Sequence, residues 1–114
     1  MSDCIFCKII RKEIPAQMIY EDEELVAFKD IHPVAPVHVL VIPKKHMVSV
    51  NDLTDGDAKT MGSIFIVIKK LASELGIAES GFRVVANSGE DGGQEVGHLH
   101  FHLLGGKPLG KKIG

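Results

Sequence analysis

The sequence predicts an α+β fold, in which an antiparallel sheet carries one long helix and a short N-terminal helix. Short apolar runs bounded by Gly, Pro and acidic residues recur along the chain, as the strands of a sheet do. One longer stretch near the middle has capping signals at both ends, as a helix does. The 114 residues show no repeat, linker or low-complexity tract, so we expect a single domain spanning residues 1–114.

The first half of the chain contains the short helix and three strands. The apolar spacing of residues 5–12 suits a helix that ends before the first proline. The runs Met18 to Tyr20 and Leu25 to Phe28 are expected strands, and we interpret the acidic residues between them as a solvated turn rather than a metal site. After a proline-rich loop, the third strand covers residues 38–42 and stops at the next proline.

The second half contains the long helix. Thr54 and Asp57 resemble a capping box and Gly76 suits a helix C-terminus, so we expect a helix over about residues 55–75. Its segment 64–68 is apolar around most of the circumference, whereas a helix that covers a sheet needs one apolar stripe. We therefore expect a homodimer, with two protomers forming a continuous dimer. The remaining expected strands are residues 82–86 and 98–104.

The composition argues against several functional classes. Hydrophobic residues make up 45% of the chain and charged residues 25%, which is typical of a globular domain. A net charge of −2 gives no electrostatic basis for binding nucleic acid. No apolar run approaches the roughly 20 residues that span a bilayer, and the N-terminus lacks the features of a signal peptide. We therefore expect a cytoplasmic protein that binds neither nucleic acid nor membrane.

Three of the six histidines alternate with apolar residues near the C-terminus. In a strand, His98, His100 and His102 project from one face, while the residues between them face the core. This pattern has three interpretations: a polar strand face, a three-histidine metal site suited to zinc or copper, or a catalytic site whose histidine is held in one tautomer.

A glycine-rich segment precedes these histidines. It contains Gly89, Gly92, Gly93 and Gly97, and Gln94 adds a neutral hydrogen-bond donor. Glycines let backbone amides converge on an anion, although an ordinary flexible connection between strands has the same composition. Beside three histidines, the segment favours a site that handles phosphate.

Three segments carry a resemblance to a known family: IFCKIIRKEIPA, FKDIHPVAPVHVLVIPKKH and VVANSGEDGGQEVGHLHFHLLGG, the last of which contains the motif HLHFHLL. They resemble, in order and over most of the chain, the Hint branch of the histidine triad (HIT) nucleotide-binding family. The resemblance implies a HIT-like fold and a purine nucleoside phosphoramidate hydrolase or nucleotidyl transferase. It implies a purine nucleotide such as AMP or its phosphoramidates as the ligand, and no organic cofactor.

The resemblance also implies roles for individual histidines. His100 would attack the α-phosphorus and form a nucleotidyl-histidine intermediate that water then resolves. Imidazole suits this role because its unperturbed pKa of about 6.5 leaves it largely neutral and nucleophilic. His102 and His38 match positions close to the phosphate. A dinucleoside polyphosphate hydrolase, a nucleotide-binding regulatory protein with little turnover and a three-histidine metalloenzyme remain alternatives.

Further matches imply a nucleotide site. Asp30 matches the carboxylate that binds the ribose, although it could simply cap a turn. The apolar base slot matches Phe6, Ile9 and Ile31, whose spacing equally suits a core. The positions around phosphate and leaving group match Asn87, Gly93, Gln94 and Glu95. Many relatives have a small hydroxyl residue where this chain has Glu95, so we do not transfer a preference for the leaving group.

Cys4 and Cys7 form a Cys-x-x-Cys motif near the N-terminus. Because no strand can precede Cys4, a redox motif is disfavoured, and two unremarkable thiols or half of a tetrahedral zinc site remain. The resemblance to zinc-containing bacterial members implies His46 and His98 as the other two ligands of a structural zinc. That division would leave His100 free to act as a nucleophile.

Overall fold

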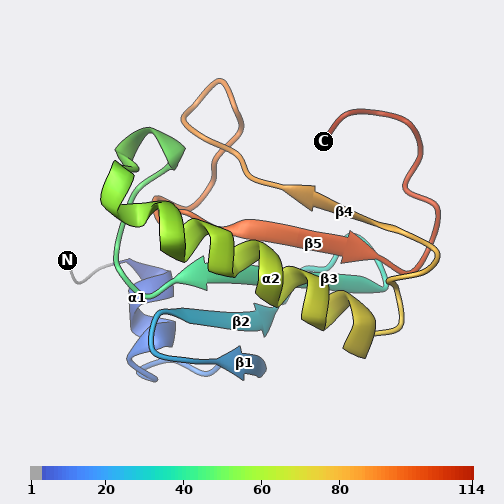
Figure 1. Ribbon diagram of the computed structural model, residues 1–114, viewed down its shortest axis with the longest axis horizontal. Coiled ribbons are helices and arrows are strands. Elements are labelled where there is room, and N and C mark those ends of the chain that lie inside the picture. Colours follow the sequence, from blue (N-terminus) through green and yellow to red (C-terminus); the bar gives the residue numbers. More distant parts are fainter. Residues whose placement is uncertain (1–3) are drawn as a thin grey trace.

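The chain forms a five-stranded antiparallel sheet with a helix against each face (Figure 1). The computed structural model describes residues 4–114, and the strands lie in the order β1-β2-β3-β5-β4. The elements are α1 (Ile5–Ile10), β1 (Met18–Glu21), β2 (Leu25–Lys29), β3 (Val37–Pro43), α2 (Ala58–Glu74), β4 (Phe82–Val85) and β5 (Phe101–Gly105). The α+β class expected from the sequence is confirmed. Within residues 4–114, no helix is both long and apolar enough to cross a membrane.

The central strands are buried on both faces. Along β3, Val39 and Val41 pack in the core beneath α2, whereas Leu40 and Ile42 pack on the opposite side with Phe6 of α1. Side chains of a strand alternate between faces, so the continuous apolar runs of β2 and β3 serve two cores at once. The face that carries α1 is the one that also carries the cleft described below.

The long helix begins and ends close to the expected residues. A 3₁₀ turn at Asp55–Asp57 carries the predicted capping box, and α2 follows it directly. At the other end Gly76 adopts a φ of 76°. The N–H of Gly76 donates to the carbonyl of Ser73, and the N–H of Ile77 donates to the carbonyl of Ala72. This pair of hydrogen bonds is a Schellman motif, which satisfies the last carbonyls of the helix.

The short helix ends two residues earlier than expected, at Ile10. Lys12 adopts a φ of 64°, and its N–H donates to Ile9 while the N–H of Glu13 donates to Lys8. The same C-terminal motif that ends α2 therefore also ends α1, here without a glycine. No local pattern in the sequence indicated this, because a lysine rarely adopts the left-handed conformation.

The last strand begins at Phe101, so the expected strand over residues 98–104 was too long at its N-terminal end. The ladder between β3 and β5 extends from the pair Val37–Gly105 to the pair Val41–Phe101. Before that point the N–H of Leu99 donates to the carbonyl of Met47 instead of to a neighbouring strand. Leu99 nevertheless stays in the core beneath α2, as an alternating pattern requires.

Candidate active site and metal site

A cleft of about 620 Å³ lies on the face of the sheet that carries α1. It is lined by most of the residues that the family resemblance implied: Phe6, Ile9, Asp30, Ile31, His38, Asn87, Gly93, Glu95, His100 and His102. These residues come from four separate parts of the chain, and the fold brings them together.

The strand order gives the cleft two different walls. Asp30 directly follows β2, so it lies on one side of the histidines, whereas Asn87 and Glu95 belong to the segment that follows β4 on the other side. The first wall is extended by the apolar residues of α1. Phe6 packs edge-on against the ring of His100, with the two ring centroids 5.1 Å apart.

The hydrogen bond of His100 determines its tautomer. The Nδ1 atom of His100 lies 2.7 Å from the backbone carbonyl oxygen of His98. A carbonyl oxygen only accepts hydrogen bonds, so Nδ1 carries the proton and Nε2 of the neutral ring holds a lone pair. His100 is 5% exposed and lines the cleft, and in this tautomer its Nε2 has the lone pair that a nucleophile needs.

His38 and His102 form a second hydrogen-bonded unit. The backbone N–H of Val34 donates to Nδ1 of His38, so the proton of the neutral His38 ring lies on Nε2. That Nε2 is 2.9 Å from Nδ1 of His102 and 3.4 Å from a carboxylate oxygen of Asp30. Accepting this proton at Nδ1 leaves His102 with its own proton on Nε2, where it can act as a donor in the cleft.

Burial keeps both of these rings uncharged. Burial lowers the pKa of His38, and the Asp30 carboxylate offsets this lowering only in part. Burial also lowers the pKa of His102 to about 4, with the nearby rings of His100 and His38 acting in the same direction. At neutral pH both rings are therefore neutral, and their tautomers are the ones that the hydrogen bonds define.

The glycine-rich segment is held by its own hydrogen bonds. The N–H of Gly93 donates to Glu90, and the N–H of Gly89 donates to the side-chain oxygen of Gln94. The side-chain amide of Gln94 donates to the carbonyls of Val48 and Val96. Gln94 therefore stabilises the conformation of this segment through hydrogen bonds, and it is not among the residues that line the cleft.

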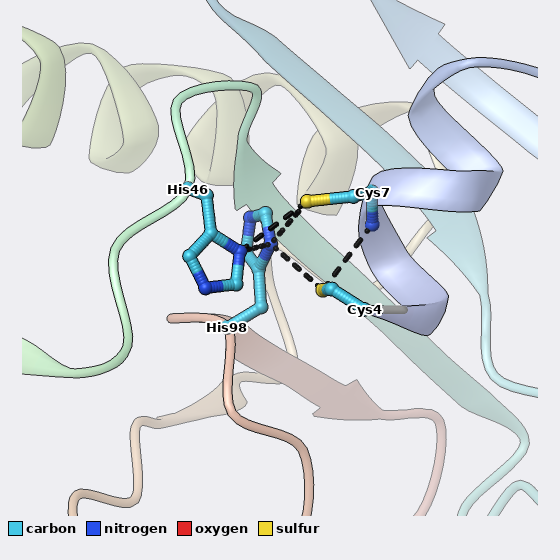
Figure 2. A group of neighbouring side chains, drawn as sticks. All are labelled: Cys4, Cys7, His46 and His98. Atoms are coloured by element: carbon cyan, nitrogen blue, oxygen red, sulfur yellow. Dashed lines mark hydrogen bonds between the residues drawn. The ribbon is translucent and has the colours of Figure 1, made fainter. Parts of the chain in front are cut away.

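A second cluster lies beside the cleft and contains Cys4, Cys7, His46 and His98 (Figure 2). One donor atom from each residue lies within 4.8 Å of the others. Cys4 caps α1 and Cys7 lies within it, His46 follows β3, and His98 precedes β5. The side chains point toward one another from these segments, so the chain holds four metal-binding groups in one place.

The tautomer of His98 suits a metal ligand. Its Nε2 lies 2.8 Å from the carbonyl oxygen of Pro43, so Nε2 carries the proton and Nδ1 has a lone pair. That Nδ1 faces Cys4 Sγ at 3.4 Å, Cys7 Sγ at 3.6 Å and His46 Nδ1 at 3.2 Å. A metal-binding histidine usually donates its other ring N–H to a carbonyl or carboxylate in this way.

The separations between the donors fit a tetrahedral site. Zinc binds sulfur at about 2.3 Å and nitrogen at about 2.0–2.1 Å, which puts tetrahedral S and N ligands about 3.5 Å apart and two N ligands about 3.3 Å apart. The separations from His98 Nδ1 given above, and the 3.3 Å between Cys7 Sγ and His46 Nδ1, agree with these values within a few tenths of an ångström. The donor set and its geometry therefore fit zinc.

The structure argues against a metal site built from all three histidines. His98 belongs to the cysteine cluster, whereas the other possible metal-binding group among residues 4–114 consists of Asp30, His38 and His102. In that group the Nε2 proton of His38 is already directed at Nδ1 of His102. His100 belongs to neither cluster, which leaves its Nε2 available for chemistry.

Two functional groups gave no signal in the sequence. They are the amide of Val34, which orients His38, and the carbonyl of Pro43, which orients His98. Backbone groups are the same in every residue, so residue types alone cannot indicate which of them meets a distant side chain. Strand alternation could have indicated Phe28 and Leu40, which line the cleft from the same face of the sheet as His38.

The chain matches known proteins along most of its length. Residues 11–109 match the family model described as the HIT domain. A purine nucleoside phosphoramidase of Escherichia coli K12 is 47% identical over 111 residues, which are 97% of this chain and 93% of that protein. A histidine triad protein from Clostridium difficile is 50% identical with a TM-score of 0.95, covering 99% of this chain and 98% of that one. A HIT family hydrolase from Clostridium thermocellum is 49% identical with a TM-score of 0.96, with the same coverage.

The environment of His102 predicts an unusual titration. We expect its imidazole to stay uncharged through neutral pH and to gain a proton only near pH 4. In the unfolded chain the pKa of this histidine has its ordinary value of about 6.5. The unfolded state therefore binds the proton first, and the fold loses stability as the pH falls from about 6.5 toward 4. Proton NMR titration of the ring signals, assigned with a His102→Asn variant, measures the midpoint. A midpoint at or above the ordinary value would show that the cleft does not desolvate His102.

Proposed function

This chain belongs to the HIT domain family, and we propose that it is a purine nucleoside phosphoramidate hydrolase that transfers the nucleotidyl group first to His100 and then to water. The observation that carries the proposal is the contact of His100 Nδ1 with the His98 carbonyl, which reserves Nε2 for the ligand in a cleft of about 620 Å³. Pockets of roughly 300–1,000 Å³ are the usual size for small ligands and cofactors. The purine nucleoside phosphoramidase among the relatives supports the substrate class.

In the first step, Nε2 of His100 attacks the α-phosphorus and forms an N–P bond. The bond to the leaving amine breaks, and the amine nitrogen takes its electron pair together with a proton that comes ultimately from solvent. His102 presents its Nε2–H toward this group, because its Nδ1 is occupied by the proton of His38. The proton of His100 stays on Nδ1, which donates to the His98 carbonyl, and this hydrogen bond stabilises the positive ring formed by the attack.

In the second step, water attacks the phosphorus of the nucleotidyl-histidine. Water contributes its oxygen to the nucleotide and releases a proton to solvent, and the bond to Nε2 returns its electron pair to His100. Imidazole is a good leaving group because it departs as a neutral ring. The proton taken up in the first step is thus released in the second, and His100 regains its starting tautomer.

The walls of the cleft supply the nucleotide contacts. We propose that the base lies against Phe6, Ile9 and Ile31, and that Asp30 binds the ribose hydroxyls. Ile31 is 80% exposed, which is unfavourable for a large apolar side chain and favours a ligand that covers it. A purine nucleotide such as AMP or its phosphoramidates matches this combination of apolar wall, carboxylate and phosphate-facing histidines.

Removing the nucleophile tests the proposed mechanism. We expect His100→Ala to lower the rate of adenosine 5′-phosphoramidate hydrolysis about a thousandfold or more, because covalent catalysis then has no acceptor. Rapid-quench mass spectrometry should detect nucleotidylated protein in the wild type and none in the variant. Full activity in a folded His100→Ala variant, or loss of activity with a chelator that leaves the fold intact, would contradict the mechanism.

Other substrates separate the remaining alternatives. Faster hydrolysis of dinucleoside polyphosphates than of phosphoramidates would favour the dinucleoside polyphosphate hydrolase. Tight binding of purine nucleotides without turnover of either class would favour a regulatory protein with little activity.

We also propose that Cys4, Cys7, His46 and His98 hold a structural zinc ion. When bound, zinc would supply a fixed cross-link between α1, the turn after β3 and the segment that leads to His100. The fit of the four donors to a tetrahedron and the tautomer of His98 support this proposal.

Two free thiols that bind a metal are typical of proteins in a reducing compartment, and we propose that the protein works in the cytoplasm.

Metal analysis tests the zinc site. Protein purified without chelator should contain about one zinc per chain by elemental mass spectrometry, and a Cys4→Ser/Cys7→Ser variant should contain almost none. His46→Ala should weaken zinc binding. The matched control is His32→Ala, which changes another exposed histidine outside the cluster and should leave zinc binding unchanged. Wild-type protein that is free of metal without ever meeting a chelator would contradict the proposal.

We further propose that the chain forms a homodimer through the outer face of α2. Phe65 and Ile66 are 51% and 67% exposed there, while Ile64 and Ile68 of the same helix are buried in the core. Sedimentation should find a dimer for the wild type and a monomer for Ile66→Glu, because a buried unpaired charge is costly at an interface. Val50→Glu changes a valine exposed elsewhere and should remain dimeric. A monomeric wild type would overturn this proposal.

A further inference from the structure

Glu95 is a carboxylate that lines the cleft without a partner of its own. It is exposed, and within residues 4–114 the structure gives its side chain neither a hydrogen bond nor an ion pair. The other side-chain carboxylate in the cleft lining, Asp30, accepts the backbone N–H of His32 and lies 3.4 Å from Nε2 of His38. The two carboxylates therefore differ, since Asp30 is engaged by the protein and Glu95 is available to a ligand.

The charges of the cleft are distributed between its two walls. Lys29 and Asp30 lie together at the end of β2, on the same wall as the apolar residues of α1. The opposite wall comes from the end of β4 and the segment after it, where Val85, Asn87 and Gly93 are uncharged and Glu95 carries a negative charge. A ligand group that lies against this second wall meets the negative charge of Glu95.

The proposed function determines which part of the substrate lies there. The nucleoside extends from the phosphorus toward Asp30 and the apolar wall, and His100 and His102 face the phosphorus itself. The remaining substituent, the amine that leaves, is directed toward the wall that carries Asn87 and Glu95.

We propose, on the basis of that function, that Glu95 selects phosphoramidates whose leaving amine carries a further positive charge. Its carboxylate attracts an ammonium group located a few ångströms beyond the scissile nitrogen and repels a carboxylate at the same place. Because the cleft is open to solvent, each of these effects is about threefold to tenfold in kcat/KM, as expected of a partly screened charge pair. The substrate class is then the nucleoside phosphoramidates of diamines and other amines with a basic side chain.

Three adenosine 5′-phosphoramidates with leaving amines of equal length test this proposal. The amine 1,3-diaminopropane ends in an ammonium group, butylamine ends in a methyl group, and β-alanine ends in a carboxylate. We expect wild-type kcat/KM to decrease in that order. Glu95→Gln, which removes the charge and keeps the shape, should reduce the ratio between the first and the third substrate about tenfold or more. The control Glu90→Gln, on the same segment but outside the cleft lining, should keep the wild-type ratio.

The outcomes separate this proposal from the function on which it rests. If the wild type hydrolyses none of the three compounds, the proposed function is wrong and the specificity fails with it. If all three are hydrolysed but Glu95→Gln leaves the ratio of the charged substrates unchanged, the function stands and the role of Glu95 is refuted. A ratio that decreases equally in Glu90→Gln would also refute it, because the effect would then come from the overall charge of the segment.

Discussion

The hydrogen bond from Nδ1 of His100 to the backbone carbonyl of His98 is the interaction on which the rest of the site depends. It determines which ring nitrogen carries the proton and therefore which nitrogen can attack phosphorus. The carbonyl itself is held in place by its own side chain, because His98 is 0% exposed, donates from Nε2 to Pro43 and directs Nδ1 at the cysteine cluster. The four-donor cluster and the tautomer of His100 are thus joined through one residue, His98, whose ring belongs to the first and whose backbone carbonyl determines the second.

The two-sided sheet makes this arrangement possible. Side chains that alternate along β2 and β3 enter two separate cores, so the face that carries the cleft need not also stabilise the packing of α2. Leu40 of β3 pairs with His102 of β5, and His38 pairs with Leu104, which sets the two histidines diagonally across the ladder. Diagonal neighbours on one face are close enough for long or ring side chains to touch, as the 2.9 Å contact of the two rings confirms.

Local patterns were sufficient for the elements and for the grouping of the histidines, but not for the details of the site. Alternation correctly placed Leu99 on the core side, even though the regular ladder ends before it. The start of β5 depends on the carbonyl of Met47, which is distant in sequence. Gln94 looked like a phosphate donor because its amide is neutral and close to the histidines. Its amide instead meets the carbonyl of Val48, a contact that exists only in the folded chain.

The most direct test of this account is the tautomer of His100 in the ligand-free protein. Long-range ¹H–¹⁵N correlation spectra of histidine-labelled protein at neutral pH distinguish protonated from unprotonated ring nitrogens. The account predicts a proton on Nδ1 of His100 and a lone pair on Nε2, with the reverse arrangement in His98. A His100 ring protonated on Nε2 would contradict it, because the atom that must attack phosphorus would then have no lone pair to offer.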